Sequence, residues 1–304
     1  MPPIQKRFPS QKIRKAKGHS RTYLLFGVLL LIIATGVGVY VWESSNPTNN
    51  GDFTISAPLG ITIRTNSTTT APITITATKQ FTGTVELTAT APPGVNAAIT
   101  PPNVTKSGTA TLTMSATTAG NYTVTVIGTS GNLRHTVSPR VATPVYATLV
   151  TTNGTIKVEL YPAQAPITVN NFVNLAQSHF YDNLVWHRIV KGFVIQTGDP
   201  NSRGGLNNST WGQGGSSQTL PLEIDISLHN TVSYLAMAHA TDPNSGSSQF
   251  YINLVDNSAG LDGKYTVFGK VTEGMDIALT IANTPVYPSS QPINLVFLET
   301  VTVQ

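Results

Sequence analysis

The sequence predicts a mainly β protein in which an N-terminal transmembrane helix is followed by a β-sandwich and then by a closed β-barrel with helical covers. Three observations lead to this prediction. Residues 22–42 carry no charge, residues 52–142 form short alternating runs rich in Thr and Val, and charged, aromatic and helical patterns return after residue 144. A chain of 304 residues is long enough for about two domains of ordinary size.

The N-terminus has the charge pattern of a single membrane span. Residues 1–21 contain seven basic residues and no acidic residue, and the uncharged run 22–42 has Tyr40 and Trp42 near its end. A helix of about 20 apolar residues crosses the hydrocarbon core of a bilayer, and basic flanks stay on the cytoplasmic side. We therefore expect a cytoplasmic tail, contact between residues 22–42 and membrane lipid, and an extracytoplasmic location at the cell membrane for everything that follows. A cleaved secretory signal is the alternative.

The net charge of the chain does not indicate a nucleic-acid-binding protein. The formal charge is +4, but the basic excess lies in the tail, and the remainder of the chain is slightly acidic. A surface that follows a phosphate backbone needs clustered Lys and Arg side chains. We therefore predict no nucleic-acid partner for the domains.

Residues 43–51 are interpreted as a polar linker and residues 52–142 as a β-sandwich. Runs such as Ile73-Thr74-Ile75 and Tyr122–Val126 alternate apolar and Thr side chains, which is typical of half-buried strands. Turn clusters rich in Pro, Gly and Asn separate the runs at intervals that suit one immunoglobulin-like module. In composition the segment resembles the Thr-rich immunoglobulin-like repeats of prokaryotic surface proteins. It contains no constellation of acid, base or metal ligands, so we expect a spacer or adhesion stalk.

Residues 145–304 begin and end with strand patterns. Two runs, 146–150 and 156–160, flank a TTNG turn and predict a hairpin, and residues 293–303 predict a closing strand.

Two helices are expected within the same region. Pro166 opens the first, because a residue at that position needs no amide donor. Residues 274–281 give a shorter second pattern. The apolar face of the first helix is predicted to contain Val169, Phe172, Val173 and Ala176. Many strands with two helices favour a closed barrel with helical covers.

Four segments in this region carry a specific resemblance. They are TNGTIKVELYPAQAPITVNNFVNLA at 152–176, YDNLVWHRIVKGFVIQTGDP at 181–200, LAMAHATDPNSGSSQFYINL at 235–254 and LDGKYTVFGKV at 261–271. In content and in order they resemble the cyclophilins over residues 145–304. The resemblance implies an eight-stranded antiparallel barrel capped by two helices, with an external groove that binds proline-containing peptides.

The resemblance also implies roles for individual residues. Arg188 matches the catalytic arginine of the family. The proline pocket is implied to be lined by Phe193, Tyr251 and Leu261. The substrate backbone is implied to be held by Gln196 and by the backbone around Ala238, His239 and Ala240. Other residues of the matched binding segments are His187, Val194 and Gln249. We expect no acid–base role for His187.

These residue types suit rotation about an Xaa-Pro bond. The bond interconverts slowly because the C–N bond has partial double-bond character, with a barrier of about 18–20 kcal/mol. Rotation breaks the resonance and localises a lone pair on the prolyl nitrogen. A fixed guanidinium, which carries its charge at physiological pH, can donate to that nitrogen as the amide twists. This is transition-state stabilisation by a preorganised donor, and it needs no nucleophile, metal or proton shuttle.

The sequence also departs from the family pattern. Gly260 stands before the LDGK segment, where many cyclophilins have an aromatic residue, so one wall of the groove is missing. Tyr251 stands where phenylalanine is common and adds a hydroxyl, and Val194 stands where methionine is common. The Gly-Gly-Asp triplet of the family is Thr197-Gly198-Asp199 here. Because of Gly260 we predict weak inhibition by cyclosporin.

Other chemistries lack their motifs. The chain has no cysteine, and it contains neither H-E-x-x-H nor G-x-S-x-G. The loop that opens at Asp199 departs from a calcium-binding pattern, because Arg203 and Thr210 occupy ligand positions. We therefore predict no metal and no cofactor.

The function predicted from the sequence is peptidyl-prolyl cis-trans isomerisation in proline-containing segments of secreted or surface proteins. The alternative is a non-catalytic peptide-binding or chaperone module of the same fold on a surface adhesion stalk. A third hypothesis makes the β-sandwich the binding end and the isomerase an accessory.

Overall fold

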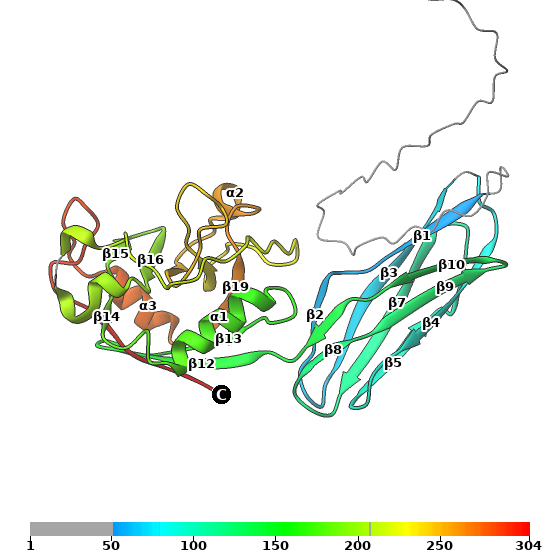
Figure 1. Ribbon diagram of the computed structural model, residues 1–304, viewed down its shortest axis with the longest axis horizontal. Helices are drawn as coiled ribbons and strands as arrows, with labels where there is room; N and C mark the ends of the chain where they lie inside the picture. The colour runs from blue at the N-terminus through cyan, green and yellow to red at the C-terminus, as the bar shows by residue number, and fades with distance from the viewer. Residues whose placement is uncertain (1–50, 79, 207) are drawn as a thin grey trace, which may run out of the picture. The chain divides into compact units, whose positions relative to one another are not determined.

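A computed structural model describes residues 51–78, 80–206 and 208–304 (Figure 1). Two β-rich modules follow one another along this part of the chain, and each has its own apolar core. We describe each module by itself.

The first module contains two four-stranded sheets and one three-stranded sheet. The first sheet has the order β1 (Asp52–Ser56), β3 (Thr68–Thr78), β7 (Gly108–Ala116) and β5 (Val95–Thr100). The second has the order β10 (Leu133–Val137), β9 (Thr125–Ser130), β4 (Thr84–Thr90) and β6 (Asn103–Thr105). The third has the order β2 (Gly60–Thr62), β11 (Arg140–Ala142) and β8 (Asn121–Thr123).

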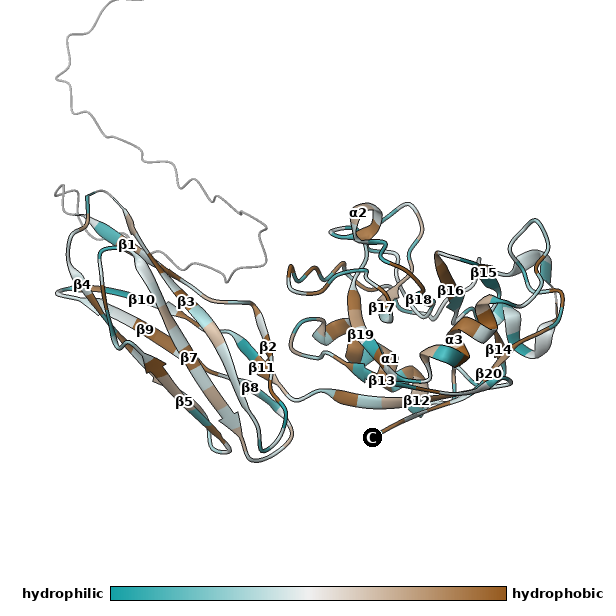
Figure 2. Ribbon diagram, turned by 180° about the vertical axis from the view of Figure 1, so that it is seen from behind, coloured by the Kyte–Doolittle hydropathy of each residue, from teal (hydrophilic) through white to brown (hydrophobic). Residues whose placement is uncertain are grey.

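Alternation of side chains builds the core of this module. In β3, Ala71, Ile73 and Ile75 are buried, while Pro72 and Thr74 between them lie on the other face. The strands accordingly alternate between hydrophobic and hydrophilic positions in Figure 2. The predicted strand character of this region is confirmed. Its assignment as an immunoglobulin-like sandwich and the predicted domain boundaries stay predictions.

The second module is built on one nine-stranded sheet, in which all neighbouring strands are antiparallel. Its order is β14 (Leu184–Val185), β20 (Phe297–Val303), β12 (Val145–Thr151), β13 (Gly154–Leu160), β19 (Val267–Glu273), β17 (Tyr234–Met237), β18 (Phe250–Asn253), β16 (Val194–Thr197) and β15 (Arg188–Val190). The helices are α1 (Pro166–Gln177), α2 (Ser258–Leu261) and α3 (Met275–Ala282), with 3-10 turns at Pro200–Gly205 and Asn208–Thr210.

The sheet is curled but not closed, which corrects the prediction of a closed eight-stranded barrel with two helices. Its two edge strands, β14 and β15, are consecutive in the chain and are separated by Trp186 and His187 alone. So short a connection brings the edges together through the covalent chain, and in the described residues no ladder of hydrogen bonds joins them. The helix count differs because the single turn α2 carries no periodic pattern that a sequence could reveal.

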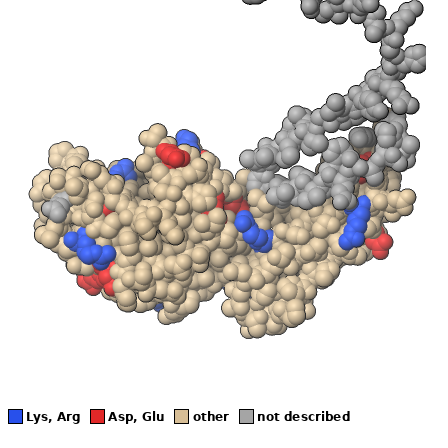
Figure 3. All heavy atoms as spheres, in the orientation of Figure 1, with Lys and Arg blue, Asp and Glu red and all other residues tan. Residues whose placement is uncertain are grey.

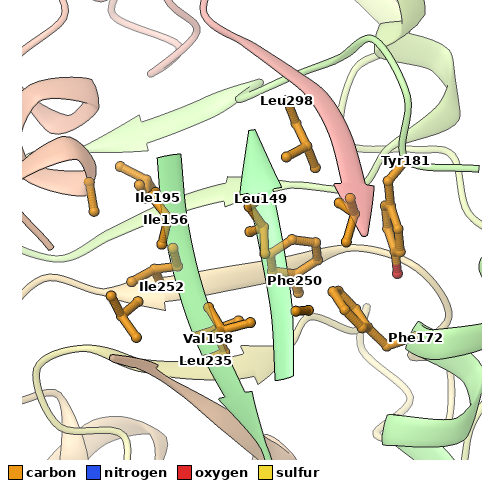
Figure 4. Packing of buried hydrophobic residues seen from close by; sticks show 14 of the residues in the cluster. Leu149, Ile156, Val158, Phe172, Tyr181, Ile195, Leu235, Phe250, Ile252 and Leu298 are labelled. Atoms are coloured by element: carbon orange, nitrogen blue, oxygen red, sulfur yellow. The ribbon is translucent and has the colours of Figure 1, made fainter. Parts of the chain in front are cut away.

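The core of the second module lies under α1. The helix begins at Pro166, as predicted, and its residues Val169, Phe172 and Ala176 are buried, with Val173 packed against them. Figure 4 shows Phe172 and Tyr181 beside Phe250 and the aliphatic side chains of the sheet. The rings of Phe172 and Phe250 meet edge to face at 5.4 Å. This core supports the strands that carry the site.

The predicted membrane location is contradicted. Among the described residues no helix is long and apolar enough to cross a bilayer. The longest, α1, has 12 residues and so spans about 18 Å, whereas a hydrocarbon core is about 30 Å thick. The predicted tail 1–21 and span 22–42 lie outside the described residues.

Candidate active site

Strand register places three of the predicted site residues in one row. Arg188 of β15 is opposite Gln196 of β16, and Gln196 is in turn opposite Tyr251 of β18. Residues directly opposite each other in antiparallel strands project from the same face of a sheet. The alternation of the sequence therefore brings a cation, an amide and an aromatic ring together, although Tyr251 is far from Arg188 in the chain.

A line of side-chain hydrogen bonds orients the polar half of the site. Arg188 donates from Nη1 to Gln196 Oε1 at 3.3 Å, and Gln196 donates from Nε2 to Gln249 Oε1 at 2.9 Å. Gln249, which is almost fully buried, donates in turn to the carbonyl of Gly214 at 2.7 Å. The bond from Arg188 uses one of the five N–H groups of the guanidinium. The remaining donors lie on a half-buried side chain next to the apolar half of the site.

A small apolar cluster forms the other half. Its buried members are Val194, Ala236, Tyr251 and Val267. Partly buried residues packed against them include Phe193, Ala238, Leu261 and Tyr265. The guanidinium carbon of Arg188 lies 5.8 Å from the centre of the Phe193 ring, so the charge borders the cluster directly. Five of the predicted residues thus belong to this cluster or pack against it, and Arg188 borders it.

A tight turn carries Phe193 to this position. The Phe193 amide donates to the Val190 carbonyl at 3.0 Å, and Gly192 has a φ of +72°, which side chains rarely tolerate. Glycine therefore suits position 192 for a conformational reason, while Lys191 is exposed.

His187 is buried behind Arg188 with only 3% of its surface exposed. Burial lowers its pKa to about 4, and the nearby Asp199 carboxylate opposes that shift only in part. The imidazole is therefore neutral at pH 7. That it takes no acid–base role stays a prediction.

The segment Ala238–Ala240 is largely occupied by bonds within the protein. The amide of Ala238 donates to the Gln249 carbonyl at 2.8 Å, and the amide of Ala240 donates to the Ser245 hydroxyl at 3.0 Å. The His239 ring stacks on Tyr265 at 4.4 Å. Its two nitrogens lie 2.6 Å and 2.7 Å from the carbonyl oxygens of Ala240 and Lys264. The amides of residues 238 and 240 are thus paired within the protein, and the implied contact of this backbone with a substrate stays a prediction.

The departures from the family pattern have clear structural settings. At Gly198, φ is +91° and an added Cβ would lie 2.3 Å from the Ser248 carbonyl oxygen, so this glycine of the triplet is required. Thr197 is accommodated because its hydroxyl donates to the Val185 carbonyl at 3.0 Å. No other heavy atom lies within 4 Å of a Cβ added at Gly260. The space beside Gly260, where the resemblance implies a wall of the groove, is therefore open.

Tyr265 is a site residue that the sequence reasoning missed. Its ring packs edge to face on Tyr251 at 5.8 Å and also stacks on His239. The signal was present, because Tyr265 lies in the matched segment 261–271. It was overlooked because an aromatic residue between Lys264 and a buried strand is equally typical of a core position.

The described residues contain no group of three or more His, Cys, Asp or Glu side chains that could hold a metal ion. Charged side chains are few among the coloured atoms on the face shown in Figure 3. The site thus combines the apolar cluster with the Arg188 guanidinium beside it.

Comparison with known proteins identifies the family. The family model for cyclophilin type peptidyl-prolyl cis-trans isomerases matches residues 146–303. Peptidyl-prolyl cis-trans isomerase-like 3 of Homo sapiens is 36% identical over 160 residues, which are 51% of this chain and 94% of the relative. Peptidyl-prolyl cis-trans isomerase cyp15 of Rhizopus delemar is 38% identical over 151 residues, which are 49% of this chain. Of that longer relative the match covers 22%.

One solved structure is a Cryptosporidium parvum cyclophilin type peptidyl-prolyl cis-trans isomerase in the presence of the dipeptide Ala-Pro. It is 32% identical and covers 52% of this chain and 98% of that chain, with a TM-score of 0.48. The family model spans more than half of the sequence, so the chain belongs to the cyclophilin-type peptidyl-prolyl cis-trans isomerases. The resemblance drawn from the four segments is confirmed.

Proposed function

We propose that residues 145–304 accelerate cis-trans rotation about Xaa-Pro bonds, with Arg188 as the donor to the prolyl nitrogen. The observation that carries the proposal is the register of β15, β16 and β18, which sets a guanidinium against an apolar cluster on one face of the sheet. The cluster of Phe193, Tyr251 and Leu261 suits a pyrrolidine ring, which has no hydrogen-bond donor of its own.

The roles of the remaining residues follow from their contacts. Gln196 holds one N–H of Arg188 and is itself held by Gln249, so the guanidinium is oriented before a substrate arrives. An oriented charge costs no reorganisation when the amide twists, and this is the condition for selective stabilisation of the transition state. Val194 contributes to the buried floor, and His187 supports the strand connection as a neutral ring.

The proposal is tested by prolyl isomerisation of a short Xaa-Pro peptide with the whole chain and with Arg188→Ala. Loss of one transition-state donor is expected to lower kcat/KM by about 100-fold or more. Lys157→Ala is the matched control, because Lys157 forms an exposed ion pair with Glu273 in the same module and lies outside the site. Equal activity of Arg188→Ala and wild type would refute the role of Arg188.

A second candidate is a peptide-binding module with little turnover. The open rim at Gly260 favours it, because a missing wall weakens the grip on the ring while leaving the groove accessible. Peptide binding without acceleration of isomerisation by the wild-type chain would establish this candidate and exclude the first.

A further inference from the structure

A buried network of hydrogen bonds lies behind the apolar cluster and centres on Asn230. The hydroxyl of Tyr251 donates to Asn230 Oδ1 at 2.8 Å, and the Asn230 side chain is completely buried. A buried hydroxyl without a partner costs free energy, so the added oxygen of Tyr251 is tolerated because Asn230 receives it. Burial, together with the charge of Asp262, also raises the pKa of Tyr251, so the phenol stays protonated and able to donate.

Asn230 holds the opposite wall as well. Its backbone N–H and its Nδ2 both donate to Asp262 Oδ1, at 2.8 Å and 3.2 Å. Although partial burial opposes it, these bonds and one from His229 keep the pKa of Asp262 below its usual range. The carboxylate only accepts, so it fixes which end of the Asn230 amide faces Tyr251. Asp262 directly follows Leu261 and so anchors the end of α2, the single turn that also carries Gly260.

A third branch of the network reaches Phe193. Asn253 donates from Nδ2 to Asn230 Oδ1 at 3.4 Å and accepts at Oδ1 from Asn257 Nδ2 at 2.8 Å. Asn257 also donates to the Phe193 carbonyl at 3.1 Å, and its amide donates to the Asn230 carbonyl at 2.8 Å. Tyr251, Leu261 and Phe193 are thus tied to one buried residue that does not belong to the apolar cluster.

We propose that Asn230 is a positioning residue for the proline pocket, acting through the hydroxyl of Tyr251 and the carboxylate of Asp262. It holds the three walls at fixed separations and so compensates for the wall that is absent at Gly260. The inference rests on the proposed proline pocket. Preorganised walls matter most during rotation about the Xaa-Pro bond. Loss of the hydrogen bond between Tyr251 and Asn230 is therefore expected to lower kcat more than it raises KM.

The test is Tyr251→Phe, which removes the hydroxyl and leaves the ring in the pocket. A hydrogen bond of ordinary strength corresponds to an expected fall of about three- to tenfold in kcat/KM for an Xaa-Pro peptide. The preference for proline over its six-membered homologue pipecolic acid is expected to fall by a similar factor, because a looser pocket admits a larger ring. Affinities of both peptides are measured beside the rates.

The matched control is Tyr181→Phe. Tyr181 is also fully buried in the second module, and its hydroxyl donates to the Ser248 carbonyl at 3.2 Å. Both variants are expected to lose comparable stability in urea, while only Tyr251→Phe changes the ratio of proline to pipecolic acid. Asn230→Ser, which shortens the side chain, is expected to reproduce the change.

The outcomes separate the inference from the proposed function. An unchanged kcat, KM and ring preference in Tyr251→Phe would overturn the inference, even if Arg188→Ala is inactive. If the wild-type chain binds peptide without turnover, the isomerase proposal fails. The inference is then decided by whether Tyr251→Phe lowers the ratio of the affinity for the proline peptide to that for the pipecolic acid peptide. Binding of neither peptide would overturn both.

Discussion

The core of residues 52–142 and the core of residues 145–303 differ in the polar side chains that are buried with them. Among the described residues of the first core, Ser56 is the one polar residue that is buried, and the other buried residues are apolar. In the second, seven polar side chains are completely buried, namely Thr168, Thr197, Asp199, Ser202, Asn230, Ser248 and Asn253. Both modules alternate apolar residues along their strands.

The buried polar groups of the second module hold irregular segments in place. Thr197 donates to the Val185 carbonyl, Ser248 donates to the Gly198 carbonyl at 2.7 Å, and Asp199 accepts from the Asn201 amide at 2.8 Å. The first bond joins β16 to β14, the second joins the loop after β16 to the loop before β18, and the third fixes the turn that begins at Pro200. Since a buried polar group stabilises a fold only when its partner is present, these residues specify loop positions that apolar packing would leave undetermined.

The largest expected effect comes from truncating one core at a time. Phe172→Ala and Phe53→Ala each remove a fully buried ring, and each is expected to destabilise its own module by about 3–5 kcal/mol. Only Phe172→Ala should abolish isomerase activity, because α1 and the sheet beneath the site lose their packing. Urea unfolding is followed by far-UV circular dichroism and by the fluorescence of Trp186 and Trp211, which report on the second module. Equal loss of activity in the two variants would show that isomerase activity depends on the packing of both modules.

The next effect is an acid instability confined to the second module. His187 has a pKa of about 4 in the folded protein against about 6.5 in an unfolded chain, so below pH 6.5 the unfolded state binds the extra proton. The contribution of His187 to the free energy of unfolding is expected to be constant above pH 6.5. Between pH 6.5 and pH 4 it is expected to fall as the pH is lowered, by at most about 1.4 kcal/mol per pH unit. The urea midpoint of the tryptophan signal checks this. His187→Gln should flatten the dependence, and an unchanged slope in that variant would assign the effect to other groups.

The smallest effect concerns the open rim of the groove. Gly260→Trp is expected to tighten binding of a proline peptide and of cyclosporin by about tenfold, because the added ring covers apolar surface where no other heavy atom lies within 4 Å of the new Cβ. Stability should change little, since the position is exposed. Ala259→Trp, on the same turn, is the control and is expected to leave both affinities near wild type. Calorimetric titration that shows no gain for Gly260→Trp would mean that the rim does not limit binding.

Much of the site could be predicted because its residues lie in local motifs. Arg188, Phe193 and Gln196 occur within nine consecutive residues, and the strand–turn–strand pattern of that segment brings them together by itself. Tyr251 and Leu261 were placed by two further motifs, and the structure packs them into the same cluster as Phe193. Asn230 was not predicted, because its partners are 21 and 32 residues away and no short pattern surrounds it.

The sequence alone determined that both modules are built mainly from strands, which face of α1 is apolar and which family the second module belongs to. These features depend on side-chain periodicity and on local motifs, which are properties of neighbouring residues. Only the tertiary structure decided that the sheet stays open between β14 and β15, that His187 is neutral, and that Asn230 joins three walls of the pocket. Each of these depends on burial and on contacts between segments that are far apart in the sequence. Such burial and contacts exist only in the folded chain, so local patterns do not reveal them.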